Sequence, residues 1–312
     1  MISDPPVDAT NRMPGAGERA LVLGGAGSAG NAWLIGVIAG LFESGLDVTA
    51  ADLIIGTSAG STAAAQITSG IAPNELLGGI LSATTQRPTS PVGSDSGRAP
   101  IGPAPDHLER MSVVIDAAKD AADMRRRMGV AALEADTTSD DSLQTQWRAT
   151  AAARLRTQDW PQQRLLIPAV DAQTGEAVVF DRHSGVDLVD AVAASTSNGF
   201  GVAPYSIGAN RYINGGYRRN ENADLAAGYA RVLVLSPFGG RSRHPPEWGM
   251  NLSTQVDELR AGGSKVETIF PDSSSEHMFG ANAMDTSLRP AAARAGYDQG
   301  RALVERLTEF WR

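Results

Sequence analysis

Residues 51–70, ADLIIGTSAGSTAAAQITSG, decide the fold of this chain. The apolar run 53–55 predicts a buried strand, and the alanine-rich run 61–69 predicts a helix. Between them, residues 56–60 read G-x-S-x-G, a pattern that holds a serine on a sharp turn when a strand precedes it and a helix follows. Ser58 is therefore the candidate nucleophile, because N–H groups at a helix start favour nearby negative charge. The alternative is a glycine- and serine-rich turn without a chemical role.

The same pattern of strand, loop and helix lies just before this stretch. Residues 19–23 predict a buried strand, residues 24–30 (GGAGSAG) a glycine-rich loop, and residues 32–44 a helix. Two successive units of this kind are typical of an α/β fold with a parallel sheet.

The glycine-rich loop has two chemical interpretations. Gly25-x-Gly27-x-x-Gly30 fits the dinucleotide fingerprint, which also needs an acidic residue about 20 positions further on. Asp47 has nearly that spacing, but it precedes the second strand rather than ending it. Alternatively, the loop supplies backbone N–H donors to an oxyanion formed at Ser58. The pairing of the two turns favours the oxyanion hole, and a plain tight turn is the third possibility.

Composition narrows the classes of function. At 312 residues with 42% hydrophobic and 20% charged residues, the chain reads as a globular protein. The net charge of −8 without a dense Lys/Arg run argues against a nucleic-acid partner. The absence of cysteine excludes thiolate catalysis and cysteine-based zinc sites, and no histidine spacing suggests a metal ion. With no leader or apolar run of about 18 residues, a cytoplasmic protein is expected.

The domain organisation expected from these patterns is simple. Residues 1–18 are predicted to form a flexible N-terminal tail, and residues 19–312 a single domain. Residues 84–105 are rich in Pro, Gly and Ser and predict a mobile loop, and residues 106–157 read as mostly helical. The segment at about 84–160 is therefore predicted to be a helical insert or lid at the site.

The second half of the chain predicts further strands and helices. Residues 212–213 predict a very short strand, followed by a tight turn at Asn214-Gly215-Gly216. The other expected elements are strands at 164–171, 177–181, 231–236 and 265–270, and helices at 186–195, 251–261 and 290–311.

Three of these stretches together resemble one known family, the patatin-like phospholipases. They are residues 24–30 after a strand, residues 56–60 at the serine turn, and Gly215-Gly216 shortly before NADLAAG at 222–228. The resemblance spans about residues 19–236 and continues through residues 296–310. It implies a three-layer α/β fold with a mainly parallel sheet, a lipid or fatty-acyl ester as substrate, transient contact with a membrane surface, and no cofactor.

The resemblance also implies the roles of the site residues. Ser58 would attack the ester, and the aspartate of an Asp-Gly-Gly motif would act as the base without a histidine. Backbone N–H groups of Gly25, Ala26, Gly27 and Ser28 would form the oxyanion hole.

Two positions depart from the family pattern. Ala29 stands where an arginine is common, which removes a positive charge and weakens the case for a preference for anionic phospholipids. Asn214 stands at the catalytic aspartate, and a carboxamide is not a base at neutral pH. Because a general base contributes about 10²–10⁴-fold, the chain is expected to be strongly impaired.

Three interpretations of Asn214 compete. It is an engineered change in an active enzyme, which the family-like sequence around it favours. Alternatively, the chain is a catalytically weak relative that binds lipids or regulates, or another group is the base. His183 and His277 are the alternative bases for Ser58, whereas His107 and His244 are expected at the surface. A nucleotide-binding oxidoreductase would rest on the glycine fingerprint alone.

Overall fold

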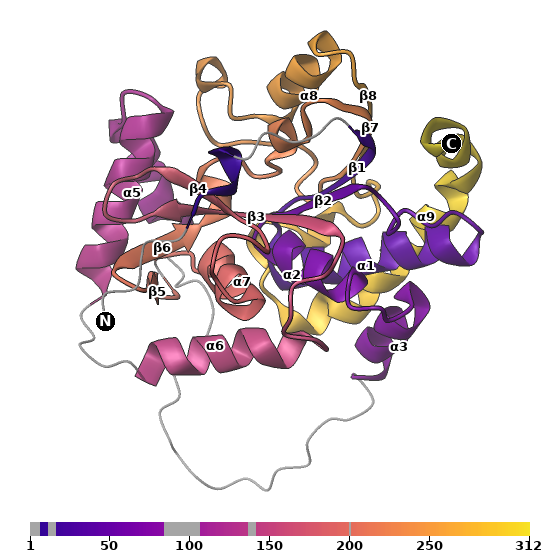
Figure 1. Ribbon diagram of the computed structural model, residues 1–312, viewed down its shortest axis with the longest axis horizontal. Coiled ribbons are helices and arrows are strands. Elements are labelled where there is room, and N and C mark those ends of the chain that lie inside the picture. Colours follow the sequence, from indigo (N-terminus) through magenta and orange to yellow (C-terminus); the bar gives the residue numbers. More distant parts are fainter. Residues whose placement is uncertain (1–6, 12–16, 84–106, 137–141, 200) are drawn as a thin grey trace, which may run out of the picture.

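The computed structural model describes residues 7–11, 17–83, 107–136, 142–199 and 201–312, which build a layered α/β protein around one sheet (Figure 1). The strand order is β5-β6-β3-β2-β1-β7-β8, with β4 also paired to β3. The parallel strands are β1 (Gly17–Leu23), β2 (Leu53–Gly56), β3 (Arg164–Asp171), β7 (Tyr229–Leu235) and β8 (Lys265–Ile269). The antiparallel strands are β4 (Ala177–Phe180), β5 (Tyr205–Ile207) and β6 (Asn210–Asn214). The predicted three-layer fold with a mainly parallel sheet is confirmed.

Alternate residues of β1 pack into the two different layers. Leu21 and Leu23 belong to a core shared with residues of α1 (Gly27–Glu43), α2 (Ala59–Ile67), α7 (Leu188–Thr196) and α9 (Arg289–Trp311). Ala20 and Val22 pack with residues of α8 (Leu252–Ala261) on the other face. Central strands buried on both faces are what a parallel sheet between helices requires.

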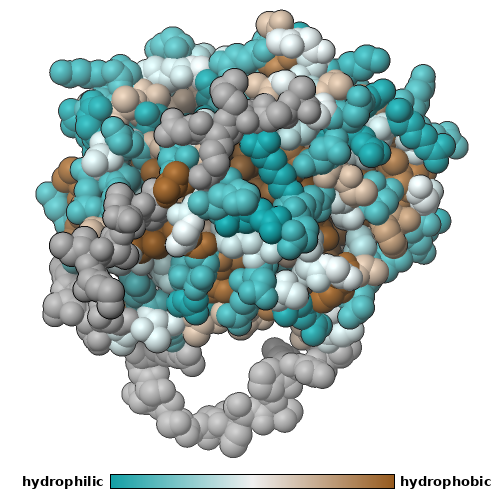
Figure 2. All heavy atoms as spheres, viewed as in Figure 1, coloured by the Kyte–Doolittle hydropathy of each residue, from teal (hydrophilic) through white to brown (hydrophobic). Residues whose placement is uncertain are grey.

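The remaining helices lie around these layers. They are α3 (Pro73–Ser82), α4 (His107–Ala117), α5 (Ala121–Ala135) and α6 (Ser142–Arg154). Short 3₁₀ turns lie at Ala9–Asn11, Gly215–Tyr217, Ala223–Ala226, Pro246–Trp248, Glu276–Met278, Gly280–Asn282 and Thr286–Leu288. Hydrophilic residues cover most of the described surface seen in Figure 2. No described helix has the length and apolarity needed to cross a bilayer.

Helix α9 packs unusually close to α1, and the two helices run parallel. An added Cβ at Gly36 or Gly40 of α1 would overlap a backbone carbonyl of α9, and one at Gly296 or Gly300 of α9 would overlap a carbonyl of α1. Glycine at these four positions therefore sets the helix separation. This packing brings Arg289, the first residue of α9, to the beginning of α1.

Two features differ from the sequence-based expectations. Helix α1 begins at Gly27 rather than near residue 32, because the Ala29 N–H donates to Ala283 O and Arg289 contacts Ser28, and no local pattern reveals these distant partners. Helix α3 was not expected, because only Leu77 and Pro73 are buried on it. The predicted loop at 84–105 lies outside the described residues.

Gly36→Ala is expected to lower the free energy of unfolding by about 1–3 kcal/mol, because the new methyl group would overlap Ala293 O and lie 2.9 Å from Tyr297 N. Gly78→Ala in α3 is the matched control, since its Cβ would meet no atom within 4 Å and should stabilise the helix by up to about 1 kcal/mol. Urea unfolding of both variants measures the effect. Equal stabilities would contradict the close packing of α1 on α9.

Candidate active site

Ser58 lies on the turn between β2 and α2 in a backbone conformation that residues other than glycine seldom adopt. Its φ is 54° and its ψ is −119°. A side chain held in such a region costs about 1–3 kcal/mol and persists only where the surroundings impose it. The Ser58 N–H donates to the Ser195 hydroxyl at 3.0 Å, which ties the turn to α7.

Two glycines make this turn possible. An added Cβ at Gly60 would overlap Leu23 O of β1, and one at Gly56 would lie 2.7 Å from Ser61 Cα. Strand β1, strand β2 and the start of α2 therefore meet without intervening side chains. The strand–turn–helix setting predicted for residues 56–60 is present.

The glycine-rich segment lies directly beside the serine turn. A Cβ built on Gly25 would be 3.1 Å from Ser58 Cβ, so glycine allows the two segments to touch. The Gly25 N–H donates to Asn220 O at 3.3 Å and is not free to bind an oxyanion. In the described part of the chain, the N–H groups of Ala26, Gly27 and Ser28 have no hydrogen-bond partner.

Helix α2 adds one more free donor that the sequence did not suggest. The Ala59 N–H, directly after Ser58, has no partner among the described residues. Ala59 lines the same cavity as Ser58 and Ala26–Ser28. Two helix N-termini therefore bring N–H groups that are unpaired among the described residues to the cavity that Ser58 lines, an arrangement able to stabilise a developing negative charge.

The structure brings Asn214 against Ser58. Asn214 ends β6, and its Nδ2 donates to Ser58 Oγ at 2.9 Å. Its Oδ1 accepts from the Gly216 N–H at 2.8 Å. This second bond fixes the direction of the amide, because a flipped amide would place two donors against each other at Gly216. No described residue accepts a hydrogen bond from the Ser58 hydroxyl.

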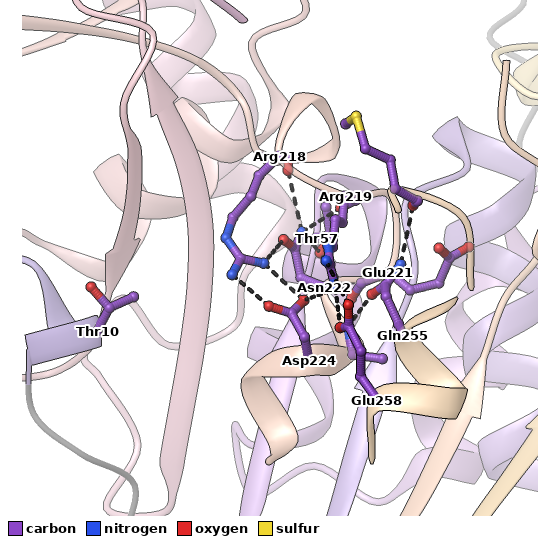
Figure 3. Close-up of polar contacts among 12 residues, drawn as sticks. Thr10, Thr57, Arg218, Arg219, Glu221, Asn222, Asp224, Gln255 and Glu258 are labelled. Atoms are coloured by element: carbon purple, nitrogen blue, oxygen red, sulfur yellow. Dashed lines mark hydrogen bonds and ion pairs between the residues drawn. The ribbon is translucent and has the colours of Figure 1, made fainter. Parts of the chain in front are cut away.

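A buried asparagine joins the two segments that carry Ser58 and Asn214. Asn222 Nδ2 donates to Thr57 Oγ1 at 2.9 Å and to Gly215 O at 3.2 Å (Figure 3). Its Oδ1 accepts from Arg218 at 2.7 Å, and Arg218 also pairs with Asp224 at 2.6 Å. Asn222 has a φ of 55°, a left-handed conformation that asparagine tolerates better than most residues.

Glu221 is a fully buried carboxyl beneath the glycine-rich segment. Its Oε1 accepts from Asn220 Nδ2 at 2.9 Å and from the Ser236 hydroxyl at 2.7 Å. Burial raises the pKa of Glu221 above its usual value of 4.5 in spite of these bonds. Glu221 lines the cavity with Ser58, and sequence reasoning did not single it out.

All these groups border one cavity of about 1460 Å³. His244 was expected at the surface, but it is half-buried in the cavity wall, and burial lowers its pKa to about 4. Its Nε2 has no partner among the residues that the structure describes. His277 lies at the cavity with Nδ1 near Ser274 O at 3.0 Å. His183 does not line the cavity. None of these three rings contacts Ser58.

The structure gives little support to the dinucleotide-binding interpretation of the glycine-rich loop. Asp47 Oδ1 accepts from Thr49 N and Thr49 Oγ1, so it closes a local turn before β2. Elsewhere, Arg126 and Arg127 of α5 form ion pairs with Asp123 of the same helix and take no part in this cavity. Among the residues described, no group of three or more His, Asp or Glu side chains is arranged to hold a metal ion.

Comparisons with known proteins identify one family and two similar structures. The patatin-like phospholipase family matches residues 21–227. The crystal structure of VipD from Legionella pneumophila is similar at a TM-score of 0.43 and 14% identity, covering 94% of this chain and 67% of VipD. The crystal structure of the type III effector protein ExoU is similar at a TM-score of 0.37 and 13% identity, covering 94% of this chain and 54% of ExoU. No curated protein matches the chain in sequence.

The strained turn predicts a difference between two variants at Ser58. Ser58→Gly should be about 1 kcal/mol more stable than Ser58→Ala, because glycine adopts φ 54° and ψ −119° without strain. Both variants lose the hydroxyl and its contact with Asn214, so their difference isolates the backbone. Thermal or urea unfolding measures it. An alanine variant as stable as the glycine variant would show that the turn is not strained.

The raised pKa of Glu221 predicts that the free energy of unfolding depends on pH. Because its pKa is raised in the folded state, its contribution is complete below its unfolded pKa near 4.5 and is lost as pH rises toward the folded value. Glu221→Gln keeps the acceptor oxygen and removes this loss. The free energy of unfolding of the glutamine variant, relative to the parent, should therefore increase as pH rises above about 4.5. Urea titrations at several pH values test this, and a constant difference would contradict it.

Proposed function

We propose, because this chain belongs to the patatin-like phospholipase family of lipid acyl hydrolases, that it is a serine acyl hydrolase acting on a lipid or fatty-acyl ester. The observation that carries the proposal is the position of Ser58. Its hydroxyl lies on a strained turn, 2.9 Å from the side chain at position 214, and it shares a cavity with four N–H groups that have no partner in the described part of the chain.

The proposed reaction begins with attack of Ser58 Oγ on the ester carbonyl carbon. The negative charge that forms on the carbonyl oxygen is stabilised by the N–H groups of Ala26, Gly27, Ser28 and Ala59. In the family pattern, an aspartate at the position of Asn214 would take the hydroxyl proton and return it to the leaving alcohol. Water then attacks the acyl-serine, and the acid is released.

Asn214 limits the first step in the present chain. Its Nδ2 donates to Ser58 Oγ, whereas a base must accept the Ser58 proton. An aspartate at the same place could accept both the Gly216 N–H and the serine O–H with no change of backbone. The same amide orientation supports a second candidate function, in which the chain binds acyl lipids and scarcely cleaves them.

The helical segment after α3 contributes to the proposed substrate site. Met111 of α4 and Trp147, Ala153 and Arg154 of α6 line the cavity. We propose that these helices form the insert that covers the bound acyl chains and that this side of the molecule contacts a lipid surface transiently. We also propose that residues 19–312, including these helices, form a single domain.

Asn214→Asp should raise ester hydrolysis by about 10²–10⁴-fold, the usual contribution of a positioned base. The rate should fall at acidic pH as the new carboxylate is protonated. The measurement is hydrolysis of p-nitrophenyl esters of several chain lengths by the parent chain and the variant. Intact mass, accurate to one dalton, confirms that position 214 of the parent is still asparagine.

The control is Ser58→Ala in both backgrounds, which should abolish the gained activity. A fluorophosphonate probe should label the Asn214→Asp chain at Ser58 much faster than the parent. If Asn214→Asp hydrolyses no tested ester faster than the variant that also lacks Ser58, position 214 is not the base, and lipid binding becomes the better description.

A further inference from the structure

The cavity beside Ser58 carries the opposite charge to the whole chain. The chain has a net charge of −8. The charged arginines of the cavity wall are Arg154, Arg156, Arg241, Arg243 and Arg289, and its acidic residues are Glu75, Glu221 and Glu276. Burial raises the pKa of Glu221 and so favours its neutral form. Within the described residues, the cavity therefore concentrates positive charge in an acidic protein, which favours an anionic ligand.

Arg289, which is half-buried, and Arg154, which is exposed, have no carboxylate partner among the described residues, and both line the cavity. Arg289 donates only to uncharged acceptors, Ser28 O at 2.9 Å, Ser28 Oγ at 3.2 Å and Asn31 Oδ1 at 3.1 Å. The Arg154 guanidinium lies over the Trp147 ring, 5.5 Å from its centroid. Neither forms an ion pair with any described residue.

A chain of amides connects the two arginines. Arg289 donates to Asn31 Oδ1, and Asn31 Nδ2 donates to Gln66 Oε1 at 3.1 Å. Gln66 Nε2 in turn donates to Arg154 O at 3.0 Å. Four helices, α9, α1, α2 and α6, thus meet at one part of the cavity wall. The glycine packing of α9 on α1 holds Arg289 at this place.

The positive charge of Arg154 acts on Arg289. Burial lowers the pKa of Arg289, and the positive charge of Arg154 lowers it further. Desolvation by the surrounding protein lowers the pKa of Arg154 as well, although the residue is exposed. Like charges on one cavity wall without a counter-ion repel each other, and an anion bound by both would relieve that repulsion.

We propose that Arg154 and Arg289 bind a phosphate group of the substrate next to Ser58. Guanidinium groups recognise phosphate through paired, charge-assisted hydrogen bonds. Arg289 contacts Ser28, so the phosphate lies beside the N–H groups that face the ester carbonyl, and only a few bonds separate these groups in a glycerophospholipid. The family pattern has an arginine at the position of Ala29, and in this proposal Arg289 of α9 supplies the positive charge in its place. The phosphate belongs either to a lipid head group or to a water-soluble phosphate ester.

This inference names the substrate class of the proposed function, and a binding experiment tests it independently of catalysis. The parent chain is titrated with dihexanoyl phosphatidic acid, with dihexanoylglycerol, and with inorganic phosphate, by calorimetry. Chromatography of each mixture shows whether the esters remain intact. Phosphatidic acid should bind more tightly than dihexanoylglycerol, which has the same acyl esters and no phosphate.

Substitutions identify the residues responsible. Arg154→Gln and Arg289→Gln should each weaken binding of phosphatidic acid by about tenfold or more, because each removes hydrogen bonds to a charged group, and should leave dihexanoylglycerol binding unchanged. Arg289→Lys should give an intermediate affinity, since it keeps the charge and loses the paired geometry. Arg301→Gln is the matched control, an arginine of α9 over the Tyr297 ring, 5.8 Å from its centroid and outside the cavity.

The ligands separate the two sources of phosphate. If inorganic phosphate binds and both Arg154→Gln and Arg289→Gln weaken its binding, the site is supported and its phosphate can come from a soluble ester. If phosphatidic acid binds but inorganic phosphate does not, a lipid head group is supported as the source. Equal affinities for phosphatidic acid and dihexanoylglycerol would overturn the proposal, as would an equal loss of both ligands in Arg154→Gln. Tight phosphatidic acid binding with no hydrolysis in Asn214→Asp would retain this site and reject the proposed reaction.

Discussion

The crossing of α2 over β1 at Gly60 is the constraint on which the site depends. Because a side chain there would overlap Leu23 O, only glycine lets the helix begin this close to the sheet. The chain must then turn sharply, and Ser58 is forced to a φ of 54°. That strain places the hydroxyl beside the glycine-rich start of α1, where backbone N–H groups of both helices remain unpaired.

The second half of the site comes from hydrogen bonds that span more than 150 residues of sequence. Asn222 ties Thr57 to Gly215, so the serine turn and the end of β6 move as one unit. The Gly216 N–H then decides which atom of the residue at position 214 faces Ser58. With asparagine that atom is a donor, so the same geometry that suits a carboxylate base leaves the present hydroxyl without an acceptor.

Much of the fold and part of the site follow from local patterns. The parallel strands, the turn at 56–60 and the short strand before Asn214 depend on hydrophobic runs and glycines that are adjacent in sequence. The rest depends on distant contacts. Helix α1 begins at Gly27 because residues near 283 and 289 satisfy its first turn, and loop residue His244 lies in the cavity wall rather than at the surface. No local signal marks Arg289 as a neighbour of Ser28.

The most direct test of the central claim is a crystal structure of the Asn214→Asp chain after reaction with a fluorophosphonate. The claim is that Ser58 is the nucleophile and that free N–H groups of α1 and α2 bind the oxyanion. We expect phosphorus bonded to Ser58 Oγ, with its oxygen accepting hydrogen bonds from Ala59 and from at least one of Ala26, Gly27 and Ser28. An adduct on another residue, or a phosphoryl oxygen directed away from these N–H groups, would contradict it.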